Sequence, residues 1–138
     1  MKFAIVVFPG SNCDHDAYHA VKHVLGQDAE FIWHKDTGLK GADVVILPGG
    51  FSYGDDIASG KILANQLIHH LKAPLQQFIA DGKLIIGICN GFQILCESHL
   101  LPGALTRNKD LHFICKDQEL EIVNNKTLWT NDYQAGQH

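Results

Sequence analysis

Cys89 is the residue whose surroundings in the sequence best suit covalent chemistry. It stands between Gly87 and Gly91, after the apolar run 84–88 and before a run with helical spacing. A cysteine in this G-x-C-x-G pattern is typical of a nucleophile elbow, a strained strand-to-helix turn whose flanking glycines prevent clashes while the sulfur is exposed. Unpaired N–H groups at the start of the helix favour a thiolate. We therefore predict that Cys89 is a nucleophile and not a small core cysteine.

A second turn that could take part in the same chemistry is P-G-G-F-S-Y-G-D at residues 48–55. Attack of a thiolate on an amide produces a tetrahedral oxyanion, which needs backbone N–H donors about 3 Å away. Two adjacent glycines can turn their N–H groups toward one point. We predict an oxyanion hole made by the N–H groups of Gly50, Phe51 and Asn90. Without Cys89, an ordinary Pro-Gly turn would be the better interpretation.

The elements that must position these turns alternate between strand and helix. Apolar runs predict strands at 3–8, 30–34, 44–47 and 84–88. Helical spacing predicts helices at 14–25, 57–71 and 90–98, and Pro74 predicts a new short helix at 74–80. This alternation indicates an α/β fold whose mostly parallel central sheet is covered on both faces, with ligands at the carboxyl ends of the strands. Alternating apolar residues predict an antiparallel hairpin over 111–123.

Composition narrows the function classes. The 138 residues are 46% hydrophobic, enough for a single domain over 1–138, and the net charge of −4 comes without a basic stripe for nucleic acid. No apolar run is long enough to cross a membrane and no signal peptide precedes the first strand, so we expect a cytoplasmic protein. The four cysteines lack metal-ligand spacing, which predicts reduced thiols. Three histidines at helical spacing could hold a metal or form a solvated face, and we favour the solvated face without a metal (His15, His19 and His23).

Four motifs together resemble one known family. They are F-P-G-S-N-C-D at 8–14, P-G-G-F-S-Y-G-D at 48–55, C-N-G-F-Q-I-L at 89–95 and L-P-G-A-L at 101–105, followed by Asn108 and F-I-C at 113–115. In this order and spacing the sequence resembles the class I glutamine amidotransferases, and within them the glutaminase subunits of phosphoribosylformylglycinamidine synthases. The resemblance extends over the whole chain and implies a flavodoxin-like three-layer sandwich.

The resemblance also implies an activity. Cys89 would attack the side-chain amide of L-glutamine, form a glutamyl thioester and release ammonia to an ATP-dependent large synthetase subunit, with a small accessory subunit in the same complex of de novo purine biosynthesis. ATP and Mg would be used by the synthetase, so no cofactor is expected in this chain, which has no Walker-type loop. Gly49 and Gln93 match positions that bind the substrate glutamine.

One feature of the family is missing from the 138 residues. The resemblance implies a His-x-Glu pair that completes the catalytic triad, and no histidine of this sequence has Glu two positions later. We therefore expect a chain truncated before that pair, with an accessible nucleophile that does not turn glutamine over by itself. Two alternatives stay open at this stage. One is a non-catalytic binding component, and the other is a cysteine-elbow hydrolase or chaperone, although that group predicts histidine where this chain has Asn90.

Overall fold

The computed structural model describes residues 1–55 and 57–138. The chain divides into two compact units, Met1–Leu105 and Thr106–His138. The single domain expected over residues 1–138 stays a prediction.

The first unit is built on a four-stranded parallel sheet. Its strands are β1 (Lys2–Val7), β2 (Asp28–Trp33), β3 (Val44–Leu47) and β4 (Leu84–Gly87), in the spatial order β2-β1-β3-β4. Every pairing is parallel, and all four residues of β3 are buried. The four predicted strands are confirmed, with ends that differ by at most two residues. This order is that of the flavodoxin-like folds.

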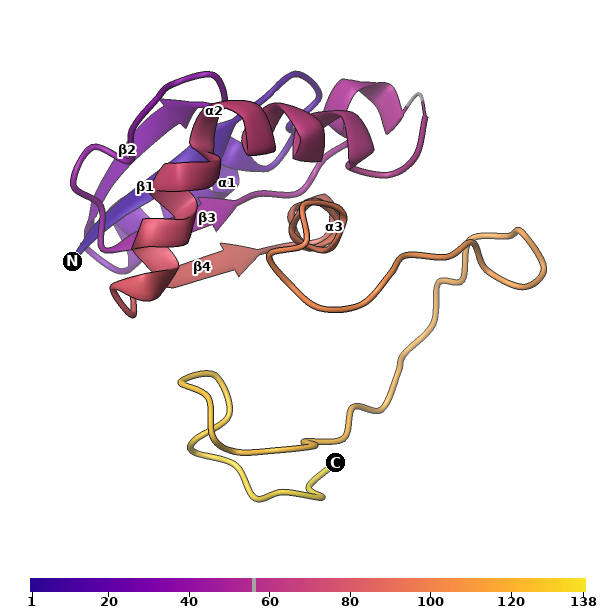
Figure 1. Ribbon diagram of the computed structural model, residues 1–138. Helices are drawn as coiled ribbons and strands as arrows, with labels where there is room; N and C mark the ends of the chain where they lie inside the picture. Colours follow the sequence, from indigo (N-terminus) through magenta and orange to yellow (C-terminus); the bar gives the residue numbers. More distant parts are fainter. Residues whose placement is uncertain (56) are drawn as a thin grey trace. The chain divides into compact units, whose positions relative to one another are not determined.

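Helices cover both faces of the sheet, as predicted. One face packs against α1 (Asp14–His19), which continues into the π-helical turn η1 (Ala20–Val24), and the other packs against α2 (Lys61–Ala80) and α3 (Asn90–Glu97). This division follows from the alternation of side chains along β1. Phe3 and Ile5 pack on the face covered by α1, whereas Ala4 and Val6 pack on the face covered by α2 and α3. In Figure 1, α2 crosses in front of the sheet and α1 lies behind it.

Helix α2 corrects two predicted boundaries. It does not begin at Ile57, because Gly60 has a left-handed conformation (φ 75°) and its N–H is bound by the Asp55 carboxylate. It also does not break at Pro74, which lies inside one continuous helix. A proline inside a helix costs about 3 kcal/mol, but here a stripe of buried side chains runs past it on both sides and packs on the sheet. The stripe is Leu63, Ala64, Leu67, Leu71, Leu75 and Phe78.

The second unit contains no strand among its described residues, so the predicted hairpin over 111–123 is wrong. Its alternating apolar side chains are largely exposed, with Phe113 at 90% and Val123 at 81%. A hairpin needs one buried face for stability, and these side chains find none. The backbone closes instead through hydrogen bonds that join Ile122 to Gly136 and Gln137. None of the described helices is both long enough and apolar enough to span a bilayer.

Candidate active site

Cys89 occupies a strained elbow between β4 and α3. Its backbone has φ 54° and ψ −111°, it forms the N-cap of α3, and its side chain is exposed. A left-handed conformation is uncommon for a residue with a β-carbon and is typical of functional turns. The local packing explains the two flanking glycines. A β-carbon on Gly91 would lie 1.9 Å from the Leu47 carbonyl oxygen, and one on Gly87 would lie 2.7 Å from the Gly91 carbonyl oxygen.

The glycine-rich loop after β3 is fastened to the turn after β1. Asn12 N–H donates to the Gly49 carbonyl (3.2 Å), Phe51 N–H to the Gly10 carbonyl (2.8 Å) and Tyr53 N–H to the Pro9 carbonyl (2.8 Å). Ser11 and Gly50 form an isolated antiparallel bridge between the two turns. A β-carbon on Gly50, whose φ is 144°, would lie 2.4 Å from the Gly10 carbonyl oxygen. Only glycine therefore fits at this position without a shift of backbone.

The same loop reaches the elbow. A β-carbon on Gly49 would lie 3.5 Å from the Cys89 Cβ and 3.6 Å from the Cys13 Sγ. Ile88 N–H donates to the Leu47 carbonyl (3.0 Å), which joins the two strand ends just before the turns diverge. The three glycine turns that follow β1, β3 and β4 therefore lie together at the carboxyl edge of the sheet, where the sequence predicts that ligands bind.

The three predicted oxyanion donors differ in whether their N–H groups are already hydrogen-bonded within the protein. The Phe51 N–H is engaged by the Gly10 carbonyl, so it is not free to bind a substrate oxygen in this conformation. The N–H groups of Gly50 and Asn90 donate to no protein atom within residues 1–55 and 57–138. Gly50 and Asn90 thus have the free donors that an oxyanion hole requires.

The side chain of Asn90 has a role that the sequence did not reveal. Asn90 is buried, its Oδ1 accepts the Ser52 N–H (3.1 Å), and its Nδ2 donates to the Gln93 Oε1 (3.0 Å). It therefore ties the elbow helix to the glycine-rich loop and also holds the amide of Gln93. Gln93, predicted to bind substrate, is half-buried one turn into α3. No motif marks such a link, because asparagine is common at a helix start for capping alone.

A buried histidine contacts Tyr53 of the glycine-rich loop. His34 is fully buried after β2, and its Nε2 lies 3.3 Å from the Tyr53 hydroxyl, with the two rings edge to face. Burial lowers the pKa of His34 to about 4, and the positive charges of Lys35 and His70 add to the effect. Burial also raises the pKa of Tyr53. Both groups are therefore neutral near pH 7, and their contact holds the strained Tyr53 (φ 53°) in place.

The turn after β1 carries a small polar cluster. Asp14 is buried, and although burial alone would raise its pKa, hydrogen bonds from His15 and Ser11 lower it overall. Cys13 is exposed and forms the N-cap of α1. The histidines of that helix are exposed, as predicted, and His19 and His23 contact each other through their rings.

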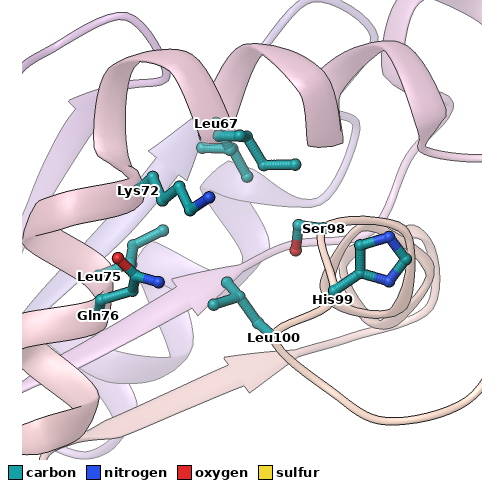
Figure 2. A pocket seen from close by; sticks show the side chains of 8 residues that line it. Leu67, Lys72, Leu75, Gln76, Ser98, His99 and Leu100 are labelled. Atoms are coloured by element: carbon teal, nitrogen blue, oxygen red, sulfur yellow. The ribbon is translucent and has the colours of Figure 1, made fainter.

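A separate cavity lies between α2 and the segment that follows α3 (Figure 2). Its volume is about 220 Å³. Figure 2 shows Leu67, Leu75 and Leu100 around it, with Lys72, Gln76 and His99 among the polar side chains. Ser98 donates its hydroxyl to the Leu95 carbonyl and is therefore already satisfied. None of these residues belongs to the three glycine turns, so we place the candidate site at the elbow and not here.

Fold and geometry together define a class. A flavodoxin-like sheet places a strained, exposed cysteine beside a loop with free N–H donors, which is the combination that covalent attack on a carbonyl group requires. The chain belongs to the CobB/CobQ-like glutamine amidotransferase domain family, whose sequence profile matches residues 1–135.

Two relatives support this assignment. The chain is 52% identical over 136 residues to the phosphoribosylformylglycinamidine synthase subunit PurQ of Salinibacter ruber, covering 99% of this chain and 57% of that protein. It is also similar to a chain in the structure of PurLQS from Thermotoga maritima, with 43% identity and a TM-score of 0.82, covering 99% of this chain and 62% of that one. The chain therefore spans about three fifths of the length of these relatives.

Proposed function

We propose that this chain carries the nucleophile half of the glutaminase component of phosphoribosylformylglycinamidine synthase. L-Glutamine is the substrate, and ammonia is delivered to an ATP-dependent large synthetase subunit, with a small accessory subunit in the same cytoplasmic complex of purine biosynthesis. The observation that carries the proposal is the strained Cys89, which lies against Gly49 of the glycine-rich loop. The 52% identity to a PurQ subunit supports the proposed role in purine biosynthesis.

The chemistry follows from the arrangement of the turns. The Cys89 sulfur attacks the side-chain amide carbon of glutamine, and the negative charge on the amide oxygen is bound by the free N–H groups of Gly50 and Asn90. Collapse of this intermediate expels ammonia and leaves a glutamyl thioester. Water then hydrolyses the thioester to glutamate.

Three predicted site residues keep roles in this proposal. Gly49 leaves room for the substrate beside the Cys89 β-carbon, and Gln93 is held by Asn90 for contact with glutamine. Phe51 joins the oxyanion hole only if its N–H leaves the Gly10 carbonyl, so Gly50 and Asn90 are the principal donors. In the family that this chain resembles, a His-x-Glu pair delivers the proton to the departing ammonia. These 138 residues do not contain such a pair.

The proposal is tested by ammonia transfer in the complex with a synthetase subunit. The Cys89→Ala variant should abolish glutamine-dependent synthesis while synthesis with added ammonia salts continues, because the synthetase reaction does not need the thiol. Cys115→Ala is the matched control, since Cys115 is also exposed but lies in the second unit. Glutamine-dependent synthesis that survives Cys89→Ala would refute the assignment.

A non-catalytic binding component is the second candidate. In such a component the elbow would have no catalytic role, yet the strained backbone of Cys89 and the close contacts of its flanking glycines are present. A binding component would support ammonia-dependent synthesis, but its Cys89 would not be alkylated by an electrophilic analogue of glutamine.

A further inference from the structure

Two exposed cysteines from different turns lie against one glycine. The point where a β-carbon of Gly49 would lie is 3.6 Å from the Cys13 Sγ and 3.5 Å from the Cys89 Cβ. Cys13 N–H also faces the Gly49 carbonyl at 3.4 Å, which keeps the turn after β1 against this loop. Because Gly49 has no side chain, nothing from this residue occupies the space beside the Cys13 sulfur and the Cys89 β-carbon. The proposed glutaminase chemistry uses only Cys89.

We propose that Cys13 is a resolving thiol for Cys89, so that a hydroperoxide converts the pair to a reversible Cys13–Cys89 disulfide. This modification goes beyond the proposed function, because it depends on the proximity of both cysteines to Gly49 and not on glutamine.

The chemistry balances with one hydroperoxide molecule. The Cys89 sulfur attacks one peroxide oxygen, the O–O bond breaks, and the sulfur becomes a sulfenic acid while the other oxygen leaves as water or alcohol. The Cys13 sulfur then attacks the Cys89 sulfur, the S–O bond breaks, and the hydroxyl group leaves as water with the proton from Cys13. Two thiols lose two electrons in total, and the peroxide gains both.

Geometry selects Cys13 over the other cysteine of the first unit. A disulfide needs its two β-carbons about 3.5–4.5 Å apart. Cys96 is buried in α3 seven residues beyond Cys89, which places it roughly 10 Å further along the helix axis. Cys13 is exposed at the N-cap of α1, where two hydrogen bonds of 3.2 and 3.4 Å to the Gly49 carbonyl hold the turn.

The disulfide would have a defined chemical effect. It would cover the nucleophile while oxidant is present, and reducing agents would restore it. It would also prevent further oxidation of Cys89 to the sulfinic acid, which ordinary thiols do not reverse.

The test treats the purified protein with a several-fold excess of hydrogen peroxide, blocks free thiols and maps peptides without reduction. The expected product is a peptide pair joined through Cys13 and Cys89, which dithiothreitol separates. In Cys13→Ser, Cys89 should accumulate several-fold more sulfinic acid under the same dose. Cys115→Ser is the control and should still form the pair.

A second measurement avoids oxidation and does not depend on a variant. Phenylarsine oxide binds two neighbouring thiols, so one equivalent should protect Cys13 and Cys89 together from alkylation in the unsubstituted protein. Protection of neither thiol, or a peroxide product in which Cys89 pairs with Cys115 or with a second molecule, would overturn the proposal. Equal sulfinic acid at Cys89 with and without Cys13 would also overturn it. These readouts are masses, so they fail or succeed separately from the glutaminase proposal.

Discussion

Gly91→Ala should destabilise the protein although alanine is the better helix former. Gly91 is the second residue of α3, where replacing glycine with alanine would ordinarily stabilise by up to about 1 kcal/mol. Here the new β-carbon would lie 1.9 Å from the Leu47 carbonyl oxygen, against the 3.0 Å below which real β-carbons essentially never approach. The helix or the end of β3 must therefore move by about 1 Å.

The magnitude follows from what that movement disturbs. Overpacking of a rigid contact costs roughly 1–3 kcal/mol. The same Leu47 carbonyl accepts the Ile88 N–H at 3.0 Å, and loss of that hydrogen bond adds about 1 kcal/mol. After the gain in helix propensity, we expect a net loss of about 2 kcal/mol, or roughly 6–10 °C in melting temperature.

Thermal and urea unfolding of Gly91→Ala beside Gly38→Ala measure this effect. Gly38 has no atom within 4 Å of an added β-carbon, so its substitution should change the free energy of unfolding by less than about 0.5 kcal/mol. If Gly91→Ala is as stable as the unsubstituted protein, the close approach of the elbow to β3 is wrong.

Three further predictions concern the site. Limiting iodoacetamide should label Cys89 before Cys13, Cys96 or Cys115, and a different first site on peptide mapping would refute the elbow assignment. Gly50→Val should suppress glutamine-dependent synthesis far more than Gly38→Val, because a β-carbon on Gly50 would lie 2.4 Å from the Gly10 carbonyl oxygen whereas one on Gly38 meets no atom within 4 Å; equal activity of the two variants would contradict the role of the Gly50 N–H. Lowering the pH from about 6.5 to 4 should reduce the free energy of unfolding, because over this range the unfolded chain binds a proton at His34 that the folded chain, with a pKa of about 4, does not. His34→Gln should flatten this pH dependence in urea titrations, and an unchanged slope would contradict the burial argument.

Much of the fold was predictable because its signals are local. Each strand of the sheet is a short apolar run that ends near a glycine-containing turn or a polar residue, which is typical of strands buried on both faces of a parallel sheet. The elbow was predictable for a related reason. Two glycines around a cysteine at a strand-to-helix junction have a steric purpose, which the contacts of Gly87 and Gly91 now show.

The features that sequence reasoning missed depend on distant partners. Pro74 indicated a break between two helices, but α2 continues through it because its apolar stripe is buried on the sheet on both sides of the proline. The alternation over 111–123 indicated a hairpin, but no buried face supports it. The link from Asn90 to Ser52 and the contact of His34 with Tyr53 join residues 38 and 19 positions apart. No local pattern could have paired these side chains.

The central claim, that Cys89 is the nucleophile of a glutamine site, is tested most directly by trapping it. The purified protein is incubated with a diazoketone analogue of glutamine, which alkylates a thiol only after binding as glutamine does, and the adduct is located by mass spectrometry. We expect one adduct per chain, on Cys89, that excess L-glutamine prevents and that Gly50→Val reduces. An adduct on Cys13 or Cys115, or labelling of Cys89 that glutamine does not slow, would contradict the claim.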